Sequence, residues 1–248
     1  MLYAALTFWL IVIAFSAWGV HWLWSRLVKP RAVNTVLLPG TLVAQLGHVL
    51  GLLVTGASVS NTKLMGDDEG GEPTADAPDK QRIPVFGPVI IGLLPLATCA
   101  ACLYLAVKLL GHGVLVREAT LYLPESLPLN LPDFWALLHN CINVMESMLS
   151  AIASSKLTWP NVIFLYLAVC LTVRMTPFEG NRRGAIGAIL ISGLIIGVIA
   201  SLANPVENAV QASWPILEFA VGMLLFLLIV SLIVSGLVGL IRILARNE

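Results

Sequence analysis

Charged residues are scarce in this sequence. Its 248 residues include 14 Lys and Arg and 14 Asp and Glu, together 11%, whereas soluble domains carry about 25%. The formal net charge is zero, so nothing suggests a nucleic-acid partner. Hydrophobic residues make up 58% of the chain, and several runs exceed the roughly 20 apolar residues of a transmembrane helix. We predict an all-α polytopic membrane protein whose partners are the lipid bilayer and other integral membrane proteins.

Cysteine and histidine are also few, with four of each. Four cysteines in apolar settings do not suggest a disulfide framework. Cys99 and Cys102 form a Cys-x-x-Cys inside an apolar segment, where the thiolates of a redox or zinc pair are disfavoured. Packing is the favoured interpretation, because buried cysteines mostly act as small hydrophobic residues. We expect no cofactor.

The sequence predicts about six apolar helical segments and one amphipathic helix. By composition the chain divides into a first membrane helix and a motif helix (1–57), an acidic flexible loop (58–83), a membrane helix (84–110), an extramembrane region (111–160) with the amphipathic helix 132–155, and three C-terminal membrane helices (161–248). The acidic loop lacks the spacing of a calcium-binding loop, so a solvated loop is favoured.

Lys and Arg tend to lie on the cytoplasmic side of a membrane protein. If the motif segment does not cross the membrane, eleven of these residues lie inside and three outside. If it crosses and the helix 132–155 does not, the numbers are six and eight; if both cross, they are ten and four. The charge bias disfavours the second arrangement. Both others place the C-terminus in the cytoplasm, and we predict a location in the bacterial inner membrane.

Small residues recur every fourth position in the last two apolar segments. Such stripes let neighbouring membrane helices approach closely. The predicted packing residues are Gly193, Gly197 and Ser201 in one segment, and Ser231, Ser235 and Gly239 in the other.

The most distinctive motif lies at the start of the second apolar segment, from Leu38 to His48, and reads LPGTLVAQLGH; Gly51 and the run Thr55 to Ala57 follow it. It resembles the zinc-binding motif of the site-2 protease family of intramembrane metalloproteases. The resemblance implies a His-Glu-x-x-His on a membrane helix and an Asp ligand on a later helix. In this chain the corresponding residues are Ala44, Gln45, His48 and, by a looser match, Asn181.

These departures remove the chemistry that the resemblance implies. Ala44 has no donor atom, Gln45 is no general base, and Asn181 carries no charge. A catalytic zinc needs three protein ligands and an open position, so we expect neither a metal site nor catalytic residues. A relocated site formed by His48, His139 and Glu146 is an alternative that the spacing does not require.

The residues that remain in the motif form two stripes. Thr41, Gln45, His48 and Thr55 lie on one side of the predicted helix, beside a small-residue stripe of Gly40, Ala44, Gly47 and Gly51. Unpaired polar groups are costly in hydrocarbon, so we expect the first stripe to form a polar seam that faces protein and hydrogen-bonds across helices. A ligand or ion path is the alternative.

Three functions fit these observations. The favoured one is a non-catalytic membrane subunit, a pseudo-protease-like scaffold or assembly partner in a membrane protein complex. The second is a divergent intramembrane zinc protease with relocated ligands. The third is a transporter or ion-conducting subunit, which ranks last because Glu218 lies close to Trp214 and is expected at the interface, and because no repeat is evident.

Overall fold

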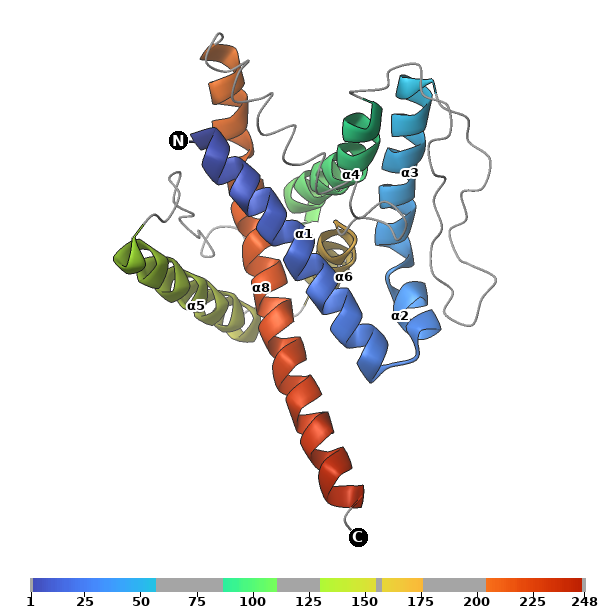
Figure 1. Cartoon of the computed structure of the whole chain (residues 1–248), viewed down its shortest axis with the longest axis vertical. Coiled ribbons are helices and arrows are strands. Elements are labelled where there is room, and N and C mark those ends of the chain that lie inside the picture. The colour runs from blue at the N-terminus through green and yellow to red at the C-terminus, as the bar shows by residue number, and fades with distance from the viewer. Residues whose placement is uncertain (1, 57–86, 111–129, 155–157, 176–203, 247–248) are drawn as a thin grey trace.

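The structure is a computed structural model that describes residues 2–56, 87–110, 130–154, 158–175 and 204–246. These residues are almost entirely helical and contain no strand (Figure 1). The helices are α1 (Leu2–Leu27), α2 (Pro30–Val36), α3 (Leu38–Thr55), α4 (Gly87–Leu110), α5 (Leu131–Ser154), α6 (Trp159–Val173) and α8 (Asn204–Arg246). The prediction of an all-helical protein is therefore confirmed for this part of the chain.

Four of these helices are long and apolar enough to cross a membrane. The corresponding segments are Ala4–Leu27, Leu38–Thr55, Ile90–Leu110 and Ile216–Leu240. Helix α6 is apolar but has 15 residues, which span about 22 Å against a hydrocarbon core of about 30 Å. The apolar segment predicted at 184–203 lies outside the described residues, as does the acidic loop 58–83.

Most predicted helices match the observed bounds closely, with two exceptions. A separate short helix, α2, lies between α1 and α3; it begins at Pro30, where the missing N–H costs nothing in the first turn. Helix α8 begins at Asn204, well before the apolar run predicted from residue 215. Its second residue is Pro205, which suits a helix start for the same reason. Apolar composition alone therefore missed the polar first turns of α8.

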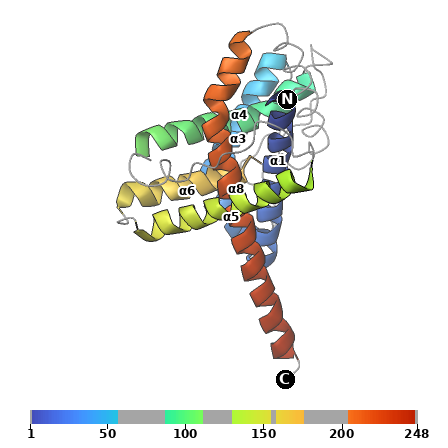
Figure 2. The same ribbon diagram turned by 90° about the vertical axis from the view of Figure 1, so that its left-hand side faces the viewer.

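The core lies where α1, α4, α6 and α8 meet. Figure 1 shows α1 passing in front of α8, and Figure 2 shows α4, α5 and α6 lying across the direction of α8. Large buried side chains from four helices fill the centre: Trp9, Leu103, Phe164, Phe219 and Leu224. The rings of Phe164 and Phe219 pack with their centroids 5.9 Å apart. This core holds α6 in place against α3 and α4.

Helix α5 covers the predicted amphipathic segment to within one residue at each end. It packs against α8, and side chains on both of its faces are exposed, among them Phe134, Trp135, Asn143 and Glu146. Its described side chains therefore do not belong to the buried core, although the helix contacts α8.

Candidate functional site

Helix α3 carries the motif and is bounded by ordinary helix signals. Pro39 lies in its first turn, and Gly56 ends it in the left-handed conformation with φ 70°. Its buried residues are mostly small or polar, whereas the large apolar side chains Leu46, Leu53 and Val54 are exposed. This arrangement is the reverse of a helix on a water-soluble protein. It suits a helix with lipid on one side and protein on the other.

The small-residue stripe is where α3 meets α4 and α6 most closely. A Cβ atom added to Gly40 would overlap the backbone carbonyl group of Cys170 on α6. One added to Gly47 would overlap the Thr98 hydroxyl and the backbone of Leu94 and Pro95 on α4. A Cβ atom added to Gly51 would lie 3.0 Å from Cα of Ile91, which is a tight contact, and Ala44 is fully buried. The backbones of α4 and α6 therefore pack directly against the small-residue stripe of α3.

A threonine on α4 completes the contact beside Gly47. Pro95 interrupts the hydrogen-bond ladder of α4 because it has no N–H. The Oγ1 atom of Thr98 lies 2.9 Å from the carbonyl oxygens of Leu94 and Pro95 and 3.3 Å from that of Val43 on α3. One hydroxyl proton serves these three acceptors in turn. The close approach at Gly47 therefore also brings a donor of α4 to the backbone of α3.

The polar seam lies inside the molecule, but its threonines bond differently from what we expected. Thr41, Gln45, His48 and Thr55 are all buried. The hydroxyl of Thr41 donates to the carbonyl of Leu37, and that of Thr55 donates to the carbonyls of Gly51 and Leu52, all within or next to α3. The expectation of hydrogen bonds across helices is therefore wrong for these two residues, because a threonine in a helix reaches the preceding turn first. Thr98 of α4 does donate across helices, to the carbonyl of Val43 on α3.

The alternative metal site is not assembled in the described part of the chain. His48 is buried in α3, whose main neighbours are α2, α4 and α6. His139 and Glu146 lie exposed on α5, where the imidazole of His139 packs near Trp135 with ring centroids 6.3 Å apart. No three His, Cys, Asp or Glu side chains come together there as a metal would require. Asn181 lies outside the described residues.

A buried polar cluster next to the stripe was missed by sequence reasoning. Arg174, just after α6, is 4% exposed and its Nη2 donates to Oδ1 of Asn34 on α2 at 2.7 Å. Nε2 of His21 on α1 lies 3.3 Å from the same oxygen. Beside this cluster, the hydroxyl of the exposed Tyr166 donates to the carbonyl of Val36 at 2.7 Å. The cluster ties α1, α2 and α6 together at one end of the molecule. Arg174 directly follows the apolar helix α6, and hydropathy alone does not place such a charge inside the molecule.

The predicted packing stripe on α8 is used only in part. Ser231 is buried and accepts a hydrogen bond from Nε1 of Trp24 on α1 at 2.7 Å. Ser235 is half-buried, and a Cβ atom added to Gly239 meets nothing within 4 Å in the described structure. Gly239 therefore makes no close contact with the described residues, and its role in packing stays a prediction. Gly193, Gly197 and Ser201 lie outside the described residues.

The bond between Trp24 and Ser231 can be tested directly. Replacing Ser231 by alanine should lower the free energy of unfolding by about 1 kcal/mol, because the indole N–H loses its acceptor. Thermal unfolding in detergent, followed by circular dichroism, measures the change. Ser235→Ala, one turn further on, is the control and should have little effect. Equal losses in both variants would contradict a specific role for Ser231.

Comparison with known proteins gives no relative. No family model, curated protein or solved structure matches the chain. The resemblance to site-2 proteases therefore depends on the motif residues alone.

Proposed function

We propose that this protein is a non-catalytic integral membrane subunit, a pseudo-protease-like scaffold in a membrane protein complex. One observation carries the proposal: the motif positions serve helix packing. Ala44, which matches a zinc ligand of the resembled family, is completely buried, and Gly40 and Gly47 on the adjoining turns are in contact range of α6 and α4. A hydrolytic zinc site needs an open position beside its ligands. Packing of this density around the motif favours a structural role.

We further place the protein in the bacterial inner membrane, with about six apolar segments and the C-terminus in the cytoplasm. The support is the Lys and Arg distribution in the sequence. The four long apolar helices are compatible with this arrangement.

The second half of α8 is the surface that best suits a partner in the membrane. Figure 1 shows this end of α8 extending beyond the other helices. Between residues 229 and 240 its exposed side chains are apolar, including Leu232, Ile233 and Leu237. Between them Gly236 and Gly239 leave open space, where another helix could approach closely. A partner helix here would cover Gly236 and Gly239, which contact nothing in the described part of the chain.

Substitutions that fill this space test the assembly role. In Gly236→Leu/Gly239→Leu the Cβ atom added at each position meets nothing within 4 Å in the described structure, so we expect the fold to persist. We expect the complex extracted in mild detergent from native membranes to shrink to the size of the isolated chain on native gel electrophoresis. Val234→Ile, on the other side of α8, is the control and should leave the complex intact.

Two results would contradict the proposal. One is a complex from native membranes that has the same size in the wild type and in the leucine variant. The other is cleavage of membrane-embedded peptides that is lost with a chelator and in His48→Ala, which would establish the divergent protease instead.

A further inference from the structure

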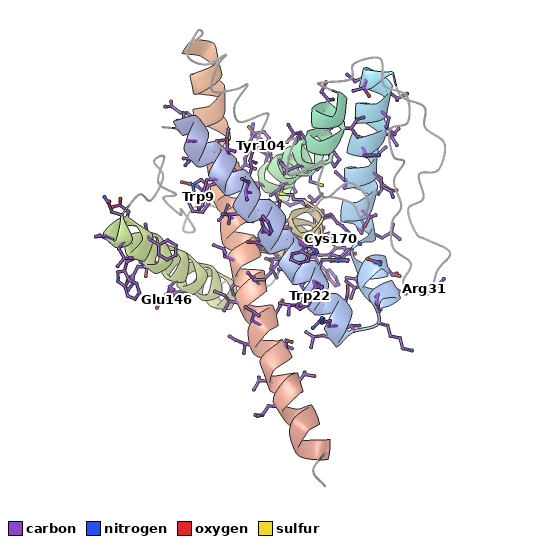
Figure 3. The ribbon with its side chains drawn as sticks, viewed as in Figure 1. Trp9, Trp22, Arg31, Tyr104, Glu146 and Cys170 are labelled. Carbon is purple, nitrogen blue, oxygen red and sulfur yellow. The ribbon has the colours of Figure 1, made fainter. Side chains whose placement is uncertain are left out.

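Three exposed cations lie at the bend between α1 and α2. We name Arg26, Lys29 and Arg31 the cationic elbow. Arg26 lies in the last turn of α1, Lys29 precedes α2, and Arg31 is its second residue. All three side chains are exposed. Figure 3 shows Trp22 near this end of α1, and Arg31 on the outer side of α2.

Aromatic rings lead from the apolar part of α1 into the elbow. Trp18, Trp22 and Arg26 are spaced four residues apart and so follow one side of the helix. The guanidinium carbon of Arg26 lies 3.7 Å from the centroid of the Trp22 ring, and the Trp18 and Trp22 rings are 6.5 Å apart. Both tryptophans are exposed, by 39% and 42%. Exposed Trp beside cations is typical of the membrane–water interface.

The elbow is also far from acidic residues along the chain. The first acidic residue in the sequence is Asp67, so α1, α2 and α3 contain none. Within the described structure the acidic side chains belong to α5 and α8. The elbow is therefore a concentrated positive charge at the end of the apolar segment Ala4–Leu27.

We propose that the cationic elbow binds the phosphate of an anionic phospholipid headgroup. A guanidinium stacked on a ring keeps its N–H donors in the plane, where they can meet phosphate oxygens. Lys29 and Arg31 add charge beside it, while Trp18 and Trp22 lie against the glycerol and upper acyl region of the same lipid. An acidic protein segment or free phosphate would match the charges but would leave the exposed rings uncovered. A phospholipid would contact both the exposed cations, through its phosphate, and the exposed rings, through its glycerol and acyl chains.

This inference depends on the placement of α1 in a membrane and not on the scaffold function. Its test uses the elbow, whereas the assembly test uses α8, so either can fail alone.

Lipid titration of the full chain tests the site. The purified protein in nonionic detergent is mixed with phosphatidylglycerol or phosphatidylcholine, and bound lipid is counted by native mass spectrometry. Each basic residue near an anionic headgroup strengthens binding about fivefold, so Arg26→Gln/Lys29→Gln/Arg31→Gln should weaken phosphatidylglycerol binding roughly a hundredfold. Binding of phosphatidylcholine should not change.

Two further variants serve as controls. Lys108→Gln removes an exposed cation that lies 4.6 Å from the Tyr104 ring centroid at the end of α4. It should leave phosphatidylglycerol binding unchanged, because a single cation there lacks the neighbours of the elbow. Arg26→Lys/Arg31→Lys keeps the charge and should retain most of the affinity, which would show that the charge and not the exact side chain carries the binding.

Several outcomes would overturn the inference. The triple variant could bind phosphatidylglycerol as the wild type does. Inorganic phosphate could displace the lipid at equal concentration, which would indicate a site for a free anion. An acidic peptide with the sequence of residues 66–73 could bind the elbow in preference to the lipid, which would indicate a protein partner. Raised salt should weaken the lipid complex, because the elbow is exposed to solvent.

Discussion

Replacing Gly47 by alanine is expected to lower the free energy of unfolding by about 2–3 kcal/mol. Alanine is the better helix former by about 1 kcal/mol, so local propensity predicts the opposite sign. Packing decides the outcome, because the new Cβ would overlap Thr98 and the backbone at Leu94 and Pro95. Backbone atoms cannot rotate away, so α3 and α4 must separate. Chemical unfolding of the full chain in detergent measures the change.

Gly236→Ala is the matched control for this prediction. The added Cβ at Gly236 meets nothing within 4 Å in the described structure, so the same substitution should be neutral or slightly stabilising. Combining Gly47→Ala with Thr98→Ala should recover only a small part of the loss, since the backbone overlaps persist. Equal stability of the Gly47 and Gly236 variants would show that α3 and α4 are not packed as described.

Replacing Asn34 by leucine should cost about 2–3 kcal/mol, since it deprives a buried guanidinium of a charge-assisted hydrogen bond. Asn34 is 4% exposed, and its Oδ1 accepts from Arg174 and lies within reach of His21. A buried charge that has lost its hydrogen-bond acceptor costs more free energy than an apolar side chain at the same place. Asn34→Leu/Arg174→Met should therefore be more stable than Asn34→Leu alone.

A double-mutant cycle on Asn34 and Arg174 measures the interaction free energy between the two residues. Thr35→Leu, at the exposed neighbouring position on α2, is the control and should shift the unfolding midpoint little. Additive losses at Asn34 and Arg174 would refute a coupled pair, and a greater loss in Thr35→Leu than in Asn34→Leu would refute the burial of Asn34.

The positions of most helices follow from local patterns. Apolar run lengths located α1, α3, α4 and α6, and an amphipathic period located α5. The exceptions, α2 and the start of α8, are polar segments in which proline begins a helix, so hydropathy does not detect them. The two stripes on α3 also follow from periodicity alone, because residues four apart share a side of a helix wherever that helix is placed.

What sequence determined here is the kind of surface each helix presents: small and polar residues on one side of α3, and large apolar residues on the other. Only the tertiary structure decided what meets those surfaces. It placed Pro95 and Thr98 against Gly47, brought Asn34 to Arg174, and paired Trp24 with Ser231. The reason is physical: periodicity is set by neighbours along one helix, whereas each of these contacts joins residues more than 45 positions apart. Their energy is realised only when separate helices pack.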